Sequence, residues 1–109
     1  MSSIDPVDLA AKLISVPSVT PASGAVFDVL DEALSAIGFT VHRFILGEAP
    51  DGPTENMVAI RVAGPGPHVG FAGHLDVVPP GDGWTGSAFE ARIEEGRLIG
   101  RGANDMKSA

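Results

Sequence analysis

The segment from Val69 to Asp82 reads VGFAGHLDVVPPGD and does most to decide the fold that this chain can adopt. Its first residues, up to Gly73, are apolar enough to form a sheet strand that ends directly before a His-x-Asp pair. Side chains two positions apart in an extended segment point to the same side, so His74 and Asp76 should emerge together. The carboxyl ends of strands are where α/β sheets place their sites. The segment therefore predicts a site at a sheet edge, followed by a loop stiffened by proline.

Two helices are predicted before this segment. The first has Asp5 as N-cap and Pro6 at its first position. It should end near Val16, because Pro17 disfavours helical geometry in the residue before it. The second should run from about residue 24 to 37, since its apolar residues share one face, and Gly38 suits a left-handed C-cap.

Short strands are predicted through the rest of the chain. Residues 39–44 read as one strand, and residues 57–62 and 68–72 as a hairpin joined by the Gly64–Pro67 linker. A second hairpin is predicted from residues 89–93 and 97–99, turning at 94–96. Two helices followed by several strands indicate an α/β domain.

Composition limits the function. The chain has 109 residues, 44% of them hydrophobic, with seven basic and fourteen acidic residues and a formal net charge of -7. This charge argues against binding to nucleic acid or anionic membranes. There is no cysteine, so any metal must be held by His, Asp or Glu, which suit zinc, cobalt or manganese.

Residues 1–5 carry acid where a secretory signal would carry base, and no apolar run approaches the roughly 18 residues of a membrane span. These features predict a cytoplasmic protein.

Asp105 has the second notable setting, in GRGANDMK at residues 100–107. It follows a Gly-x-Gly turn where a helix should begin, and a carboxylate there can present oxygens to a metal or serve as an ordinary N-cap. The turn does not indicate a dinucleotide site, because Asp105 stands where the third glycine of that motif would lie against pyrophosphate.

The pairing of GHLDVVP at residues 73–79 with GRGANDMK about thirty residues later closely resembles the M20 metallopeptidase family of amidohydrolases and exopeptidases. The similarity runs through essentially the whole chain. Within the family, the Ser18–Pro21 turn and Pro79–Asp82 are most similar to deacylases that release succinate from an N-succinylated diamino diacid. Those enzymes often have Thr at the position of Leu75, and Gly-Ser where this chain has Ser108-Ala109.

The resemblance implies a role for each site residue. His74 would be a ligand of one metal, Asp76 the catalytic-site carboxylate that orients and tunes His74, and Asp105 the carboxylate that bridges two metals. The cofactors would be two divalent metal ions, with zinc favoured and cobalt as the alternative, and the substrate a small N-acyl amino acid. The family mechanism uses metal-activated water and a glutamate base.

The resemblance also implies a larger protein than this chain. Residues 1–109 would be the amino-terminal portion of a zinc-exopeptidase-like catalytic domain with a mixed sheet flanked by helices. The glutamate base, three further ligands and a lid domain that builds a homodimer would lie beyond Ala109. The chain by itself should then be inactive.

Two other functions stay open from the sequence. The chain could belong to a family member with another substrate, or to a non-catalytic relative that keeps the fold. Asp82 and Trp84 could line the substrate entrance, although packing within their loop is the simpler explanation.

Overall fold

A computed structural model describes residues 3–109, so Met1 and Ser2, which began the segment used to predict localisation, lie outside the described residues. The elements in chain order are α1 (Pro6–Ile14), α2 (Ala25–Ala36), β1 (Thr40–Leu46), β2 (Thr54–Ile60), β3 (Arg92–Glu94), β4 (Arg97–Ile99) and the short turn η1 (Ala103–Lys107). The predicted α/β class is confirmed. The expected mixed sheet is not what the described residues form, because their strands make two separate two-stranded antiparallel sheets.

Both predicted helices are present. Asp5 caps α1, since its Oδ1 accepts from the backbone N–H groups of Val7 and Asp8 at 2.9 and 3.1 Å. Gly38 follows α2 with a φ of 96°, the left-handed conformation expected of it. Between residues 3 and 109 no helix combines the length and apolar character needed to cross a membrane.

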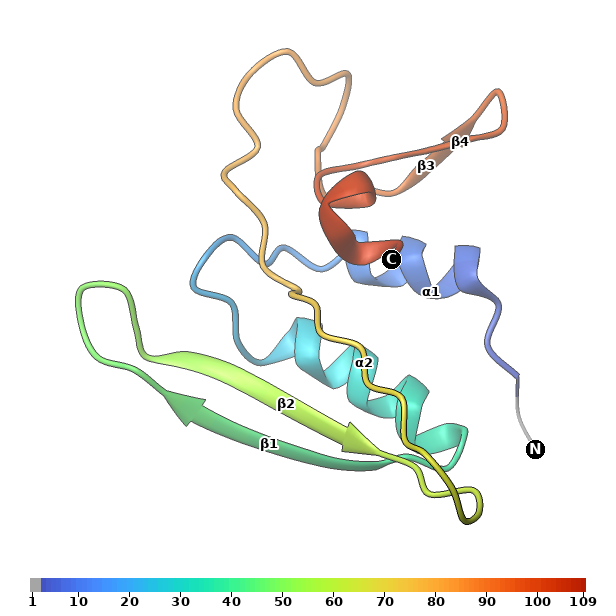
Figure 1. The fold of residues 1–109 in the computed structure, drawn as a ribbon. Coiled ribbons are helices and arrows are strands. Elements are labelled where there is room, and N and C mark those ends of the chain that lie inside the picture. The colour runs from blue at the N-terminus through green and yellow to red at the C-terminus, as the bar shows by residue number, and fades with distance from the viewer. Residues whose placement is uncertain (1–2) are drawn as a thin grey trace.

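The first predicted hairpin is wrong. β2 pairs with β1, in a register from Thr40 opposite Ile60 to Leu46 opposite Thr54, and not with residues 68–72, which form no strand here. Pairing with β1 occupies one edge of β2 only, and the prolines of the Gly64–Pro67 linker have no N–H to donate to a hairpin at its other edge. Residues 64–73 instead run as an extended segment across α2 (Figure 1).

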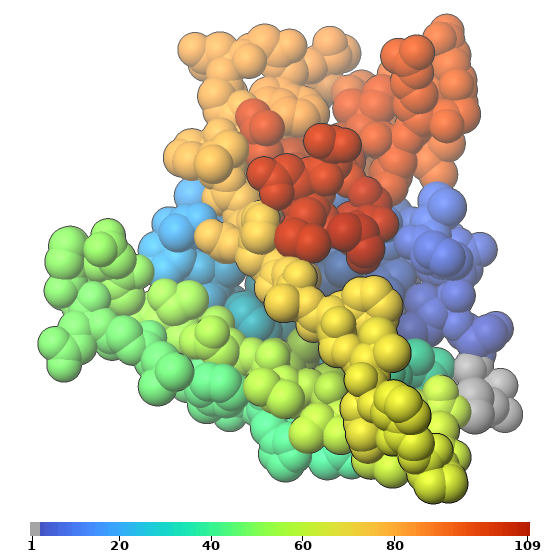
Figure 2. Space-filling model, viewed as in Figure 1, coloured from blue at the N-terminus to red at the C-terminus, as the bar shows by residue number. Residues whose placement is uncertain are grey.

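This extended segment is open to solvent. Phe71 is 99% exposed and Val69 82% exposed, although both were expected to lie in a sheet. The segment crosses the visible face of the molecule, coloured yellow, on its way from β2 to the red carboxyl-terminal turn (Figure 2). The apolar pattern there is that of a strand, but no strand lies beside it among residues 3–109.

The second predicted hairpin is confirmed. β3 pairs with β4 in antiparallel register, from Arg92 opposite Ile99 to Glu94 opposite Arg97. It is shorter than expected, because residues 89–91 lie outside the strand. The hairpin leads directly into the glycine turn that carries Asp105.

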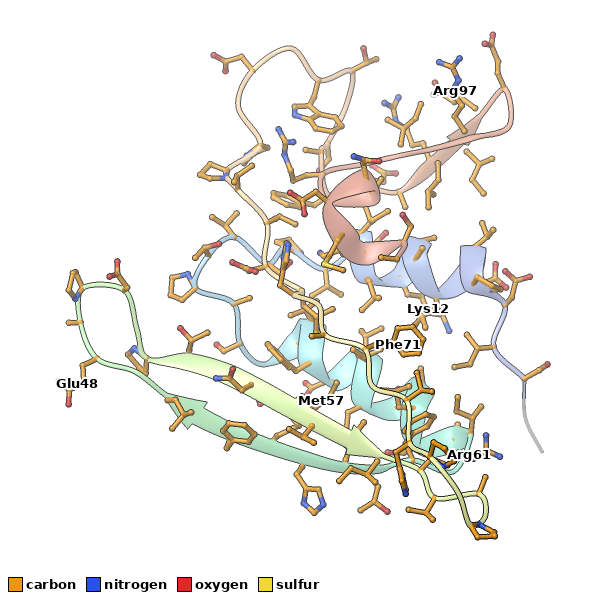
Figure 3. The ribbon with its side chains drawn as sticks, viewed as in Figure 1. Lys12, Glu48, Met57, Arg61, Phe71 and Arg97 are labelled. Atoms are coloured by element: carbon orange, nitrogen blue, oxygen red, sulfur yellow. The ribbon has the colours of Figure 1, made fainter. Side chains whose placement is uncertain are left out.

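The core lies between α1 and α2. Its buried members are Leu13, Ala22, Val26 and Phe27. Met57 of β2 packs against this cluster (Figure 3). Leu75 packs against it from the extended segment. Leu75 therefore points away from its neighbours His74 and Asp76, as alternation in an extended segment requires.

Arg43 joins α2 to the β1–β2 sheet. Its guanidinium lies 2.7 Å from Glu55, 2.6 Å from Asp28 and 3.4 Å from Asp31, and 6.0 Å above the Phe27 ring. The hydrogen bond from Arg43 lowers the pKa of the Glu55 carboxyl, which also accepts from the Gly24 N–H at 2.7 Å. This network holds the sheet against α2.

Candidate metal-binding site

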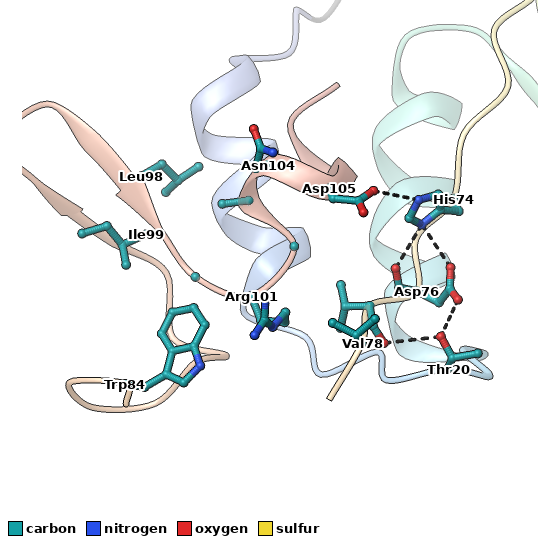
Figure 4. Close-up of a pocket in the computed structure, with 14 residues that line it drawn as sticks. Thr20, His74, Asp76, Val78, Trp84, Leu98, Ile99, Arg101, Asn104 and Asp105 are labelled. Atoms are coloured by element: carbon teal, nitrogen blue, oxygen red, sulfur yellow. Dashed lines mark hydrogen bonds and ion pairs between the residues drawn. The ribbon is translucent and has the colours of Figure 1, made fainter. Parts of the chain in front are cut away.

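The structure brings the three predicted site residues together. The imidazole of His74 lies between two carboxylates, with Nε2 3.0 Å from Asp105 Oδ1 and Nδ1 3.1 Å from Asp76 Oδ1 (Figure 4). His74 and Asp105 are 31 positions apart in the sequence. Nδ1 also lies 3.1 Å from the backbone oxygen of Asp76. That carbonyl, followed by the charges of both carboxylates, raises the pKa of His74 against the opposing effect of burial.

The segment that carries His74 and Asp76 is held by the turn after α1. Ser18 Oγ donates to the Leu75 carbonyl at 2.9 Å, the Val77 N–H donates to the Ser18 carbonyl at 2.9 Å, and the Thr20 N–H donates to the Val77 carbonyl at 3.1 Å. The result is a parallel bridge between Val19 and Val77. The strand predicted for residues 69–73 is absent, so this turn is what fixes the His-x-Asp pair.

Asp105 is placed by a compact turn and not by the start of a helix, which corrects the prediction. η1 is a single turn in which Asp105 and Met106 have non-helical backbone angles. Gly102 has a φ of 90°, and a Cβ there would lie 2.6 Å from Val77 Cγ1, so only glycine lets the turn approach the His74 segment this closely.

Lys107 fastens this turn to α1. Its side chain is buried, and Nζ donates to the carbonyls of Leu13 at 2.7 Å and Val16 at 3.3 Å, at the carboxyl end of the helix. A cation is stabilised there by the helix dipole and by the unpaired carbonyls. Burial lowers the pKa of Lys107. This role of Lys107 was not predicted, although its position two residues after Asp105 was a signal that it could help to place the turn.

Met106 closes the gap between the two site segments. The His74 N–H lies 3.4 Å from Met106 Sδ, and a Cβ at Gly73 would lie 3.0 Å from Met106 Cε. The Met106 side chain therefore packs directly against the Gly73–His74 backbone, where the segment that carries Asp105 meets the segment that carries His74.

The site opens into a pocket of about 470 Å³. Besides the three site residues, the pocket is lined by Thr20, Trp84 and Arg101 among others. Trp84 Nε1 and an Arg101 terminal nitrogen both donate to the Pro80 carbonyl, at 2.8 and 2.7 Å, and the guanidinium lies 5.3 Å above the indole ring. Trp84 thus packs in its loop and also faces the pocket, whereas Asp82 is not among the residues that line it.

Residues 70–109, which include all three site residues, match the family described as Peptidase family M20/M25/M40. These residues are similar to the M20 peptidase family. The resemblance predicted from the sequence is therefore confirmed.

Relatives in the M20 family are similar along the whole chain. A succinyl-diaminopimelate desuccinylase of Sphingopyxis alaskensis is 65% identical over 97% of this chain and 28% of its own length. Proteins of the same name from Rhizorhabdus wittichii and Novosphingobium aromaticivorans are 61% and 57% identical, over 97% and 100% of this chain and 28% and 29% of their own lengths. The chain thus spans less than a third of the length of these curated relatives.

The donor atoms fit part of an M20 metal site. An imidazole nitrogen and a carboxylate oxygen face each other at 3.0 Å at the pocket wall, and both types of atom bind divalent zinc or cobalt. The other imidazole nitrogen is held by Asp76, the arrangement that orients a metal-bound histidine. Within residues 3–109, no three His, Asp or Glu side chains form a group that could hold a metal by themselves. A complete coordination shell therefore needs ligands in addition to His74 and Asp105.

Proposed function

We propose that this chain forms the amino-terminal portion of the catalytic domain of a succinyl-diaminopimelate desuccinylase. The reaction would be hydrolysis of the amide of N-succinyl-LL-2,6-diaminopimelate to succinate and the free diamino diacid, a step of diaminopimelate and lysine biosynthesis. The observation that carries the proposal is the 65% identity to a desuccinylase along 97% of the chain, in which the His74–Asp105 pair lies at the pocket wall.

In this proposal some residues of the chain bind the metal and another orients the imidazole ligand. His74 Nε2 and the exposed Asp105 carboxylate would hold the metal. Asp76 accepts from His74 Nδ1, which keeps Nε2 unprotonated and directed at the metal. Two divalent ions, zinc or alternatively cobalt, would lower the pKa of the attacking water and polarise the scissile carbonyl.

Other parts of the protein complete the mechanism in this proposal. A glutamate would take the proton of the attacking water, and it would lie beyond Ala109 together with the remaining ligands. The lid domain of a homodimer would cover the substrate, and the compartment would be the cytoplasm. The pocket beside Trp84 and Arg101 would be the chain's share of the substrate cavity.

Substrate comparison tests the proposal. The intact protein, loaded with zinc, is expected to hydrolyse N-succinyl-LL-2,6-diaminopimelate with a kcat/KM at least about a hundredfold above that for N-acetylornithine. The acetyl group has no terminal carboxylate, so the protein groups that bind the charged succinyl end would be left without a partner in the transition state. A preference for N-acetylornithine would assign another M20 activity, such as acetylornithine deacetylase, aminoacylase or carboxypeptidase. Hydrolysis of none of these substrates would favour a non-catalytic relative. Residues 1–109 alone should give no turnover above a metal-only blank.

A further inference from the structure

We propose that Thr20 is a positioning residue that fixes the Asp76 carboxylate and, through it, the imidazole of His74 for metal binding. The inference rests on the proposed metal-binding role of His74, but not on the identity of the substrate. Thr20 belongs to the turn after α1, more than fifty positions before the residues on which it acts.

The Asp76 carboxylate is held at both oxygens. Oδ1 lies 3.1 Å from His74 Nδ1, and Oδ2 accepts from Thr20 Oγ1 at 2.5 Å (Figure 4). A carboxylate held at one oxygen can rotate about its terminal bond, whereas one held at both keeps its plane and its direction. The hydroxyl of Thr20 therefore fixes the acceptor that faces the imidazole.

Thr20 is itself rigidly placed against the same segment. Its N–H donates to the Val77 carbonyl at 3.1 Å, and the Val77 N–H donates to the Ser18 carbonyl at 2.9 Å. Backbone hydrogen bonds next to both residues thus set the distance between the Thr20 hydroxyl and the Asp76 carboxylate.

Thr20 is exposed, and it lines the pocket while lying outside the buried core. Packing energy therefore gives little reason for a threonine at this position. The Thr20 hydroxyl can donate one proton, and two acceptor oxygens lie near it: Asp76 Oδ2 and the Val77 carbonyl oxygen, the latter at 3.4 Å. The contact to the Asp76 carboxylate is the shorter of the two. The bond to Asp76 is the feature that distinguishes this side chain from the rest of the turn.

The consequence for a metal follows from the imidazole. A carboxylate fixed at Nδ1 selects the tautomer that leaves Nε2 as a lone-pair donor and holds the ring plane toward Asp105. Loss of such a supporting contact costs about 10- to 100-fold in metal affinity. Loss of the Thr20 hydroxyl should lower metal affinity by a similar factor, although Thr20 contacts neither His74 nor Asp105.

Three variants of the intact protein test the proposal. Thr20→Val keeps the shape and removes the hydroxyl, whereas Thr20→Ser keeps the hydroxyl. Ser35→Ala is the matched control, because Ser35 Oγ also donates to an aspartate, Asp31, at 3.0 Å, but on α2 away from the site. The readouts are zinc affinity by chelator competition, the visible absorption spectrum of the cobalt-loaded protein, and the melting temperature of the metal-free protein.

Thr20→Val is expected to weaken zinc binding by about 10- to 100-fold and to change the cobalt spectrum. The melting temperature of the metal-free Thr20→Val protein should be no lower than that of the metal-free Ser35→Ala control. Thr20→Ser should restore both the affinity and the spectrum. Wild-type zinc affinity and spectrum in Thr20→Val would overturn the proposal, as would a Thr20→Ser variant as impaired as Thr20→Val. These measurements involve no substrate, so they can succeed even where the desuccinylase assay fails, and the reverse also holds.

Discussion

Two regions of the molecule each use one basic side chain to join elements that are separate in the sequence. In the α2–β1–β2 region, Arg43 is half-buried and lies among three carboxylates. In the site region, the buried ammonium of Lys107 has backbone carbonyls as its partners. Charge pairs near the surface are replaceable and individually weak, whereas a buried charge with fixed carbonyls sets one geometry. The comparison indicates that the first region supports the fold and that the second aligns a site.

The largest effect is expected at Asp105. In the intact protein, Asp105→Ala should lower kcat/KM for amide hydrolysis by about a thousandfold or more, because losing a ligand removes several kcal/mol of transition-state stabilisation. Asp82→Ala is the control, since Asp82 lies in the neighbouring loop but does not line the pocket. An equal loss of kcat/KM in Asp105→Ala and Asp82→Ala would show that Asp105 has no special role in the site.

Lys107→Met should have the next largest effect. The substitution removes the hydrogen bonds that Nζ donates to the Leu13 and Val16 carbonyls and should destabilise the protein by about 1–3 kcal/mol, with weaker zinc binding in the same variant. Urea unfolding and chelator competition measure the two effects. Lys12→Met, an exposed lysine of the same helix, should change neither. A Lys107→Met protein that is less stable but binds zinc normally would make Lys107 a fold residue like Arg43.

Arg43→Met should have a smaller and purely structural effect. Loss of its pairs with Glu55 and Asp28 should destabilise the protein by about 1–2 kcal/mol, because the pairs are only partly screened from solvent. Zinc affinity should remain that of the wild type, since no described contact links Arg43 to His74 or Asp105. A shift in zinc affinity would show that the two regions are coupled.

The smallest effect is a pH dependence of stability. The pKa of Glu55 is lowered on folding from the ordinary 4.5, chiefly by Arg43. The unfolded state therefore binds this proton first as the pH falls. The stabilisation is present well above pH 4.5 and is lost as the pH falls through the lower folded pKa. Urea unfolding between pH 7 and pH 3 should show a shallower acid loss for Glu55→Gln than for the wild type. Identical slopes would contradict this assignment.

The sequence predicted local features well. The Asp5 cap and the β3–β4 hairpin follow from residues close together in the chain, and the structure has both. The His74–Asp76 contact follows from the two-residue alternation of an extended segment. Such features are set by short-range geometry and need no knowledge of the rest of the fold.

Pairing between distant segments was harder to predict. The apolar residues 57–60 fit a hairpin with residues 68–72 as well as they fit β1, and only tertiary structure decides which partner they take. Thr20 and Lys107 escaped notice because their roles depend on contacts across 56 and 94 positions. The meeting of His74 with Asp105 came from family resemblance, since spacing alone could not bring them together.

The proposed function requires His74 and Asp105 to bind the same metal ion. Anomalous diffraction at the zinc edge from crystals of the intact protein would locate that ion. An anomalous peak is expected about 2.0–2.2 Å from both His74 Nε2 and an Asp105 oxygen, with Asp76 on the far side of the imidazole. A zinc peak bonded to neither residue, or to His74 through Nδ1 with Asp76 displaced, would contradict it.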